Sequence, residues 1–193
     1  MFTGIVSAVG VVIETDPSRI AINHAATARR LKGGSSVAVN GCCLTVVKRS
    51  GPAFFADIVP ETLRRTNLGA LKVGSLVNLE LPIAANGLLD GHLVQGHVDA
   101  HATVKRVKQV AAGLEVEIGM PKDLAHFVAE KGSIAVDGVS LTVSGVDDAK
   151  GVFSVALIPH TVGATIAHEY KPGSIVNLEI DVVARYVARN LRR

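Results

Sequence analysis

The chain has 193 residues, of which 48% are hydrophobic and 19% are charged, and its formal net charge at pH 7 is +3. This length and apolar content predict a folded chain with one large or two small domains and exclude extensive disorder. The charge is small, only 4% of residues are aromatic and Trp is absent, which argues against a nucleic-acid-binding surface.

The N-terminal sequence MFTGIVSAVGVVIE has no basic leader before its apolar residues, and Gly4 and Gly10 interrupt it. This pattern favours neither a signal peptide nor a membrane span. The two cysteines, Cys42 and Cys43, are adjacent, and a disulfide between neighbours needs unusual backbone geometry. We therefore predict two free thiols in a cytoplasmic protein with no membrane partner.

Short runs of strand-forming residues, separated by Gly, Asn and Asp, follow along the chain. Such short, closely spaced strands favour a small closed barrel, because closure leaves no exposed sheet edge. In the first half, strands are predicted at 5–13, 36–39, 44–47, 53–58 and 76–81, with counterparts in the second half, and short helices are predicted at 62–68 and 123–128.

From residue 180 onward the pattern changes to helical spacing, with Asp181 near the predicted start. Two interpretations are open: the helix packs on its own barrel, or it meets copies of itself in other subunits. The first half ends at Leu81 without such a helix, so a barrel does not need one, which favours assembly. The apolar stripe consists of Ile180, Val183, Ala184, Val187, Ala188 and Leu191.

The chain contains a tandem repeat. SVAVNGCCLTV at 36–46 returns as SIAVDGVSLTV at 133–143, GSLVNLE at 74–80 returns as GSIVNLE at 173–179, and FTGIV at 2–6 matches VQGHV at 94–98. Blocks that recur in one order indicate duplication of a whole domain. We therefore expect an N-terminal barrel over 1–88, a C-terminal barrel over 89–179 and a C-terminal oligomerisation helix over 180–193.

The two copies differ at a few aligned positions. A polar residue beside glycine, followed by a small nucleophile-type side chain and Thr, is typical of a pocket floor at the end of a strand. Cys42 falls opposite Val139 and is predicted to be a core residue. The substituted pairs are Asn40/Asp137, Cys43/Ser140 and Ile5/His97, whereas Gly41/Gly138, Leu44/Leu141 and Thr45/Thr142 are kept.

Five blocks in one order, MFTGIV, NGCCLTV, ETLRRTNLG, GHLVQGHVDA and KGSIAVDGVSLTV, resemble the alpha-type riboflavin synthase family over nearly the whole chain. The resemblance implies an all-β fold of two six-stranded Greek-key barrels and a C-terminal helix that builds a homotrimer. It implies conversion of two molecules of 6,7-dimethyl-8-ribityllumazine into riboflavin and 5-amino-6-(ribitylamino)uracil, the last step of riboflavin biosynthesis, without cofactor or metal. Lumazine synthase is a further partner that this assignment raises.

The resemblance also implies one lumazine in each barrel, with the active site where the N-barrel of one subunit faces the C-barrel of its neighbour. The catalytic residues it implies are Cys43, His97, Asp137 and Ser140. The N-barrel contacts would be Gly4, Ile5, Val6, Cys43, Leu44, Thr45, Asp57, Ile58, Val59, Pro60, Glu61 and Thr62. The C-barrel contacts would be Gly96, His97, Val98, Ser140, Leu141, Thr142, Ile158, Pro159, His160, Thr161 and Val162, with Lys131 reaching a ligand held mainly by another chain.

Each predicted site residue also has a purely structural interpretation. Cys43 could be a small buried strand residue, His97 a satisfied core histidine, and Asp137 a turn residue before glycine. His92 is expected to be structural or exposed. The stretch 165–170 departs from the family pattern, and we expect it to reshape the outer wall of the C-barrel.

The main rival function is a non-catalytic lumazine- or flavin-binding protein of the same fold. Relatives of the enzyme keep the duplicated barrel, only bind a chromophore, and look degraded at the reactive positions. The present chain keeps all of these positions, which favours the enzyme: Cys43, His97, Asp137, Ser140 and Thr142.

Overall fold

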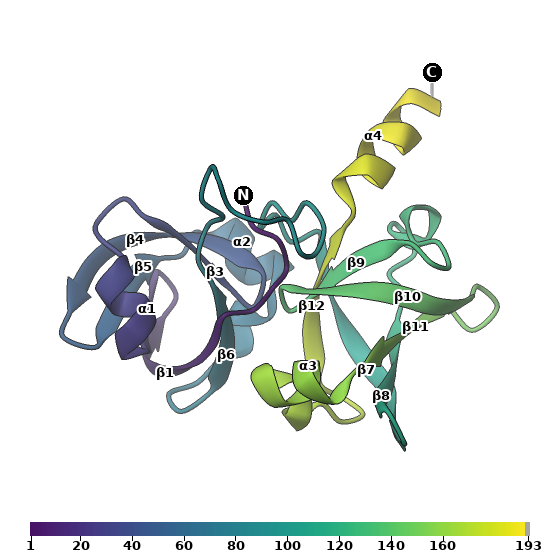
Figure 1. Cartoon of the computed structure of the whole chain (residues 1–193), viewed down its shortest axis with the longest axis horizontal. Coiled ribbons are helices and arrows are strands. Elements are labelled where there is room, and N and C mark those ends of the chain that lie inside the picture. Colours follow the sequence, from purple (N-terminus) through teal and green to yellow (C-terminus); the bar gives the residue numbers. More distant parts are fainter. Residues whose placement is uncertain (192–193) are drawn as a thin grey trace.

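The computed structural model describes residues 1–191 and contains two closed antiparallel barrels that lie side by side (Figure 1). The strand order around the N-barrel is β1-β2-β5-β4-β3-β6, and the C-barrel repeats the same Greek-key order with β7 to β12. The N-barrel strands are β1 (Ala8–Asp16), β2 (Arg19–Asn23), β3 (Ser36–Val39), β4 (Cys42–Ser50), β5 (Ala53–Asp57) and β6 (Leu76–Glu80). The C-barrel strands are β7 (Ala100–Val110), β8 (Gly113–Gly119), β9 (Ser133–Val136), β10 (Val139–Asp147), β11 (Val152–Leu157) and β12 (Ile175–Ile180).

The duplication extends to the irregularities of the sheets. The β1–β2 pairing shifts register between Val12 and Glu14, and the β7–β8 pairing shifts at the aligned place, between Val104 and Arg106. The β4–β5 and β10–β11 pairings shift at a second aligned pair of positions, after Val46 and after Val143. Bulges bend a strand and increase its twist, so these four shifts help to close both barrels in the same way.

Helical segments are short and lie between the strands. The helix predicted at 62–68 is divided at Thr66, whose hydroxyl donates to Thr62 O (2.7 Å) and accepts from Leu68 N (3.2 Å). Strand β2 and helix α1 were not predicted, because both are very short and α1 is capped by His24 rather than by a usual capping residue. The segments are α1 (Ala25–Arg30), α2 (Pro60–Arg65), α3 (Pro159–Ala164), α4 (Val182–Leu191) and the 3₁₀ turns η1 (Asn67–Ala70), η2 (Ala125–Phe127) and η3 (Ile166–Glu169).

Each barrel encloses its own apolar core, and a third small cluster joins them. Phe54 and Phe153 are fully buried, one in each barrel core. The joining cluster consists of Phe2, Ala38, Val94 and Ala135. The first residues of the chain therefore pack between the barrels, where Phe2 N donates to Val94 O at 2.7 Å.

Two glycine turns meet back to back where the barrels touch. A Cβ on Gly41 would lie 2.6 Å from Gly138 N, and a Cβ on Gly138 would lie 2.7 Å from Gly41 N. Reciprocal hydrogen bonds flank this contact: Asn78 Nδ2 donates to Asp137 O (2.9 Å) and Asn177 Nδ2 donates to Asn40 O (2.8 Å). The contact and its hydrogen bonds thus relate aligned residues of the two repeats reciprocally.

The C-terminal helix α4 leaves the barrels and extends outward (Figure 1). Ile180 was wrongly placed in its apolar stripe, because it is buried as the last residue of β12. None of the helix residues in the described part of the chain is buried, and Val183 is 60% and Val187 52% exposed. Within one chain Val183, Val187 and Leu191 are more than half exposed, whereas Ala184 and Ala188 are half-buried and α4 contacts the η2 turn. Packing on its own barrel and assembly with other subunits therefore both stay predictions, and the expected helix residues 192–193 lie outside the described residues.

The base of α4 is nevertheless fixed. Arg185 Nη1 lies 2.9 Å from Asp99 Oδ1, and Asp99 Oδ2 accepts from Ile180 N at 2.9 Å. These contacts hold the direction in which the helix leaves the C-barrel. No helix within residues 1–191 combines the length and apolar character needed to cross a membrane.

Candidate functional site

The turns at Gly96 and Gly4 lie over the two aligned positions that are predicted to carry nucleophile-type side chains, Cys43 and Ser140. Cys43 N donates to Gly96 O (2.9 Å), and Ser140 N donates to Gly4 O (2.8 Å). A Cβ on Gly96 would be 2.5 Å from Cys43 Cβ, and one on Gly4 would be 2.6 Å from Ser140 Cβ. Both glycines also have positive φ, so only glycine allows the turns to lie this close.

The turns cross between the barrels. Val98 packs against the N-barrel core although it precedes the first C-barrel strand, and Val6 packs against the C-barrel core although it precedes β1. The expected grouping was therefore wrong: Gly96, His97 and Val98 belong with Cys43, and Gly4, Ile5 and Val6 belong with Ser140. The physical reason is that each segment visits the other barrel before it enters its own.

A cavity of about 180 Å³ lies at the Cys43 position. Cys43 is half-buried there, and His97 is exposed at the opening. Cys42 is buried in the N-barrel core, and burial raises the pKa of its thiol to about 12. Cys42 is thus the packing thiol, as predicted, and it stays protonated at neutral pH. The cavity is lined by Cys42, Cys43, Glu61, Thr62, Arg65, Thr66, Gly96, His97 and Val98.

Charged side chains form the rim of this cavity. Glu61 pairs with Arg64 and, at 2.6 Å, with Arg65, and these hydrogen bonds lower the pKa of its carboxyl group. Arg65 also donates to Asp99 O (3.2 Å), which links the rim to the segment after His97. The carboxylate of Glu61 is therefore ionised and held by cations on its own helix.

The Ser140 position contains a histidine that sequence reasoning left without a role. His92 Nδ1 lies 2.7 Å from Ser140 Oγ, and His92 N donates to Thr3 O (3.1 Å). Burial lowers the pKa of His92, so its imidazole is neutral at neutral pH and can accept the hydroxyl proton. The Cys43 cavity has His97 and the Ser140 position has His92, so each reactive position has its own imidazole.

Asp137 is not brought together with Cys43, His97 or Ser140 in one cavity. It is 1% exposed in the turn between the barrels, with φ of 45°. Its Oδ1 accepts from Asn67 Nδ2 (2.9 Å) and Asn177 N (2.8 Å), and its Oδ2 accepts from Tyr170 OH (2.8 Å). Burial raises the pKa of Asp137 to about 7, although these hydrogen bonds lower it. Its catalytic role stays a prediction. Its hydrogen bonds join residues of the N-barrel half and the C-barrel half within one chain.

The other predicted contact residues fall into three groups by burial. Leu44, Ile58 and Leu141 point into the barrel cores, so only their backbone atoms can face a ligand. Thr62, Thr161 and Val162 are half-buried. The exposed residues are Ile5, Thr45, Asp57, Val59, Pro60, Lys131, Thr142, Ile158, Pro159 and His160, of which Asp57 pairs with Arg19 at 2.9 Å.

Buried polar residues of the two VNLE blocks were also missed. Asn78 lies in the middle of β6 and Glu80 ends it, Asn177 and Glu179 lie at the aligned places in β12, and all four are buried. The sequence pattern could have revealed them, because Asn and Glu recur at the same two places in both copies of an otherwise apolar strand. Buried polar groups need partners, so their recurrence predicts a shared structural task.

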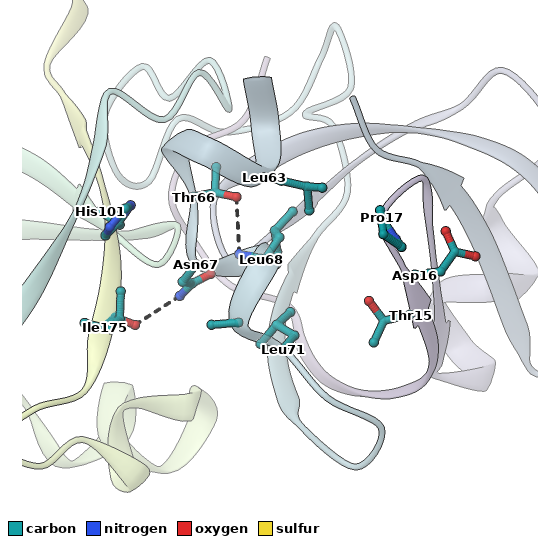
Figure 2. Close-up of a pocket in the computed structure, with 12 residues that line it drawn as sticks. Thr15, Asp16, Pro17, Leu63, Thr66, Asn67, Leu68, Leu71, His101 and Ile175 are labelled. Carbon is teal, nitrogen blue, oxygen red and sulfur yellow. Dashed lines mark hydrogen bonds between the residues drawn. The ribbon is translucent and has the colours of Figure 1, made fainter. Parts of the chain in front are cut away.

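A groove of about 610 Å³ lies between the barrels, and none of the predicted site residues lines it (Figure 2). Asn67 donates across it to Ile175 O (3.2 Å), and His101 lines its C-barrel side. The predicted site residues Cys43 and Ser140 lie instead beneath the turns at Gly96 and Gly4. Within residues 1–191, no group of three or more His, Cys, Asp or Glu is placed to hold a metal ion.

Comparisons with known proteins agree with this arrangement. A family model described as the lumazine binding domain matches residues 3–82 and 95–181. The chain is 46% identical over 198 residues to the riboflavin synthase of Mycobacterium tuberculosis (strain ATCC 25618 / H37Rv), covering 100% of this chain and 98% of that protein. It is 41% identical over 195 residues to the riboflavin synthase of Actinobacillus pleuropneumoniae, covering 99% and 90%.

Solved structures with the same fold hold ligands. LumP in complex with 6,7-dimethyl-8-(1'-D-ribityl) lumazine is 28% identical, with a TM-score of 0.83, over 93% of this chain and 99% of that chain. LumP in complex with riboflavin is 29% identical, with a TM-score of 0.85 and the same coverage. The sequence relatives and the structural neighbours thus share one ligand class.

Proposed function

The chain belongs to the lumazine-binding domain family, and we propose that it is a riboflavin synthase, which converts two molecules of 6,7-dimethyl-8-ribityllumazine into riboflavin and 5-amino-6-(ribitylamino)uracil. The chain-wide identity of 46% to a protein of that name carries the proposal. The structural neighbours named LumP are less similar, at 28% and 29%. The reaction is a transferase reaction that moves a four-carbon unit between two identical molecules.

The chemistry needs little beyond placement and proton transfer. The carbanion formed at the 7-methyl group of the lumazine is delocalised into an electron-poor ring, so a modest base and hydrogen bonds to the ring carbonyls suffice. His97 lines the cavity beside Cys43, and its imidazole can carry the proton. Holding the two lumazine rings face to face lowers the entropic part of the activation free energy by roughly several kcal/mol. Because the two substrates and two products have the same atoms, no external oxidant or reductant is needed.

One assay separates the enzyme from the rival, a non-catalytic lumazine- or flavin-binding protein. Pure protein is incubated with 6,7-dimethyl-8-ribityllumazine alone, and flavin absorbance is followed. A synthase accumulates riboflavin in a one-to-two ratio to the lumazine consumed. If the lumazine persists with only a shifted spectrum, the binding protein is correct, and if its spectrum is unchanged, both functions are wrong.

Ser140→Ala is expected to lower kcat about tenfold, equivalent to about 1.4 kcal/mol of transition-state stabilisation. The hydroxyl is lost from beneath the Gly4 turn, whereas the half-buried Cβ remains in place, so stability changes little. Steady-state kinetics and thermal unfolding measure the two effects. Ser144→Ala, at an exposed position of the same strand, is the control. A loss of kcat matched by an equal loss of folded protein would contradict the prediction.

We further propose that the protein is a homotrimer in which the N-barrel of one subunit faces the C-barrel of the next. The exposed side chains in the stripe of α4 support this, because Val183, Val187 and Leu191 are all more than half exposed in the single chain. A helix whose apolar stripe is exposed gains stability when a partner covers it. Arg185 and Asp99 fix the base of the helix, so the stripe is presented in one direction.

The double variant Val183→Asp, Val187→Asp is expected to sediment as a monomer and to lose at least about tenfold in activity. Each Asp would place a charge in a contact that the proposed trimer buries, and this opposes association. Analytical ultracentrifugation and the flavin assay measure the two outcomes. Arg189→Asp, which changes the charge by the same amount on the opposite side of α4, is the control. A fully active monomer would refute the shared site.

Two further expectations stay predictions. The cytoplasmic location rests on the free thiols Cys42 and Cys43. Lumazine synthase as a partner rests on the proposed function, because that enzyme would supply the substrate. Co-purification with its endogenous partners tests the second.

A further inference from the structure

Two buried glutamates occupy equivalent places in the two barrels and have no part in the chemistry described above. Glu80 is 6% exposed at the end of β6, and Glu179 is 3% exposed in β12. Burying a carboxylate is costly unless donors surround it. Their partners therefore indicate what these side chains do.

Each carboxylate binds the backbone of a glycine turn with both oxygens. Glu80 Oε1 accepts from Thr3 N (2.7 Å) and Thr3 Oγ1 (2.9 Å), and its Oε2 accepts from Gly4 N (3.1 Å). Glu179 Oε1 accepts from Gln95 N (2.6 Å), and its Oε2 accepts from Gly96 N (2.9 Å). Consecutive N–H groups that converge on one anion form a fixed cradle, and charge-assisted hydrogen bonds are stronger than neutral ones.

The two turns are those that cover the reactive positions of the opposite barrels. The turn held by Glu179, a C-barrel residue, covers Cys43 of the N-barrel, and His97 follows it directly. The turn held by Glu80, an N-barrel residue, covers Ser140 of the C-barrel. Each barrel thus supplies the carboxylate that binds the turn lying over Cys43 or Ser140 of the other barrel.

We propose that Glu179 is the positioning residue of the Cys43 cavity and that Glu80 is the positioning residue of the turn over Ser140. The proposal deepens the proposed function and rests on it for the identity of the ligand. Glu179 acts through Gly96 and His97, because it holds the backbone from which the imidazole projects. A change at Glu179 or Glu80 in one barrel therefore alters the turn that lies over Cys43 or Ser140 in the other barrel.

The conservative variants Glu179→Gln and Glu80→Gln form a matched pair. Each keeps the side-chain size, but the amide group can accept at only one of its two ends, so at least one backbone N–H is left facing a donor. Both substitutions affect the same kind of contact in equivalent strands, so a general loss of stability should be similar in the two variants. An effect confined to one turn is therefore separable from a merely structural effect.

Alkylation of Cys43 by iodoacetamide in the ligand-free protein reports on the Cys43 cavity only. Cys43 is half-buried beneath Gly96, whereas Cys42 is buried and its thiol has a pKa of about 12, so Cys42 is unreactive. We expect Glu179→Gln to raise the alkylation rate of Cys43 at least about fivefold, because the turn at Gly96 is held less firmly. Glu80→Gln should leave that alkylation rate within about twofold of the wild type. Mass spectrometry assigns the modified residue.

A second measurement connects the turn to ligand binding. 6,7-Dimethyl-8-ribityllumazine is expected to protect Cys43, and Glu179→Gln should require at least about tenfold more lumazine for half-protection. Glu80→Gln should leave this protection curve unchanged, because it acts on the turn over Ser140. If lumazine fails to protect wild-type Cys43, the ligand assigned by the proposed function is wrong, whereas the ligand-free rates still test the positioning role.

Each of the following results would overturn the proposal: equal Cys43 alkylation rates in the two variants, a wild-type alkylation rate in Glu179→Gln, or a raised alkylation rate in Glu80→Gln. Glu179→Asp keeps the charge on a side chain shorter by one methylene, and an intermediate rate is expected. If Glu179→Gln does not fold, Glu179→Asp replaces it, and a Cys43 alkylation rate equal to that of the wild type would then overturn the proposal. An Asp variant no slower to react than the Gln variant would show that the carboxylate does not hold the turn.

Discussion

Gly138→Ala is expected to lower the free energy of unfolding by at least about 4 kcal/mol, because a backbone clash is added to backbone strain. The new Cβ would lie 2.7 Å from Gly41 N and 2.8 Å from Gly41 Cα. Both atoms belong to backbone at the contact between the barrels, so no flexible side chain can move aside. The φ of +77° adds strain for any residue with a Cβ.

The control for this clash is Gly151→Ala, where φ is +63° and nothing lies within 4 Å of the added Cβ. That variant carries the strain alone, about 1–2 kcal/mol. Urea-induced unfolding of both variants isolates the clash as the difference. Gly41→Ala should match Gly138→Ala, since its Cβ would lie 2.6 Å from Gly138 N. If Gly138→Ala and Gly151→Ala lowered the free energy of unfolding equally, the turns at Gly41 and Gly138 would not support each other.

Asp137→Asn is expected to become more stable relative to the wild type as pH rises. The folded pKa of about 7 lies above the ordinary value of 3.8, so the folded protein binds more protons than the unfolded chain between these values. The stability from this group is fully present below pH 3.8 and is lost as pH rises through 7. The loss is about 1.4 kcal/mol per pH unit and on the order of 4 kcal/mol in all. Asparagine does not titrate, so the variant lacks this loss.

Unfolding free energies of both proteins from pH 4 to 8 measure this effect as a difference, which cancels the titration of other groups. Tyr170→Phe is a second variant: it removes a hydrogen bond that lowers the pKa of Asp137, so the transition should move to higher pH. Parallel pH curves for the wild type and Asp137→Asn would show that the carboxyl group titrates normally. Loss of turnover at a pH where both proteins are fully folded would support the catalytic role predicted for Asp137.

Strand positions followed from the sequence where the apolar alternation was strong. Strand β3 has the predicted bounds, and β5 and β6 each end one residue before the predicted position. Strand β1 was placed too early because residues 5–7 are apolar or small, and the structure uses them to cross to the other barrel. The helix at 62–68 was divided because the Thr66 hydroxyl ends one segment and caps the next, which a periodicity count does not detect.

The sequence by itself determined that the protein is a duplicated barrel, that Cys42 packs in the core, and that Cys43 and Ser140 occupy equivalent places. Repetition and the apolar pattern are local properties of the chain, so alignment of its halves reads them directly. Only the tertiary structure decided that the Gly96 turn covers Cys43, that the Gly4 turn covers Ser140, and that Glu179 and Glu80 hold them. An alignment gives a residue's place within its own repeat, whereas the barrel that a crossing segment touches depends on packing between the repeats.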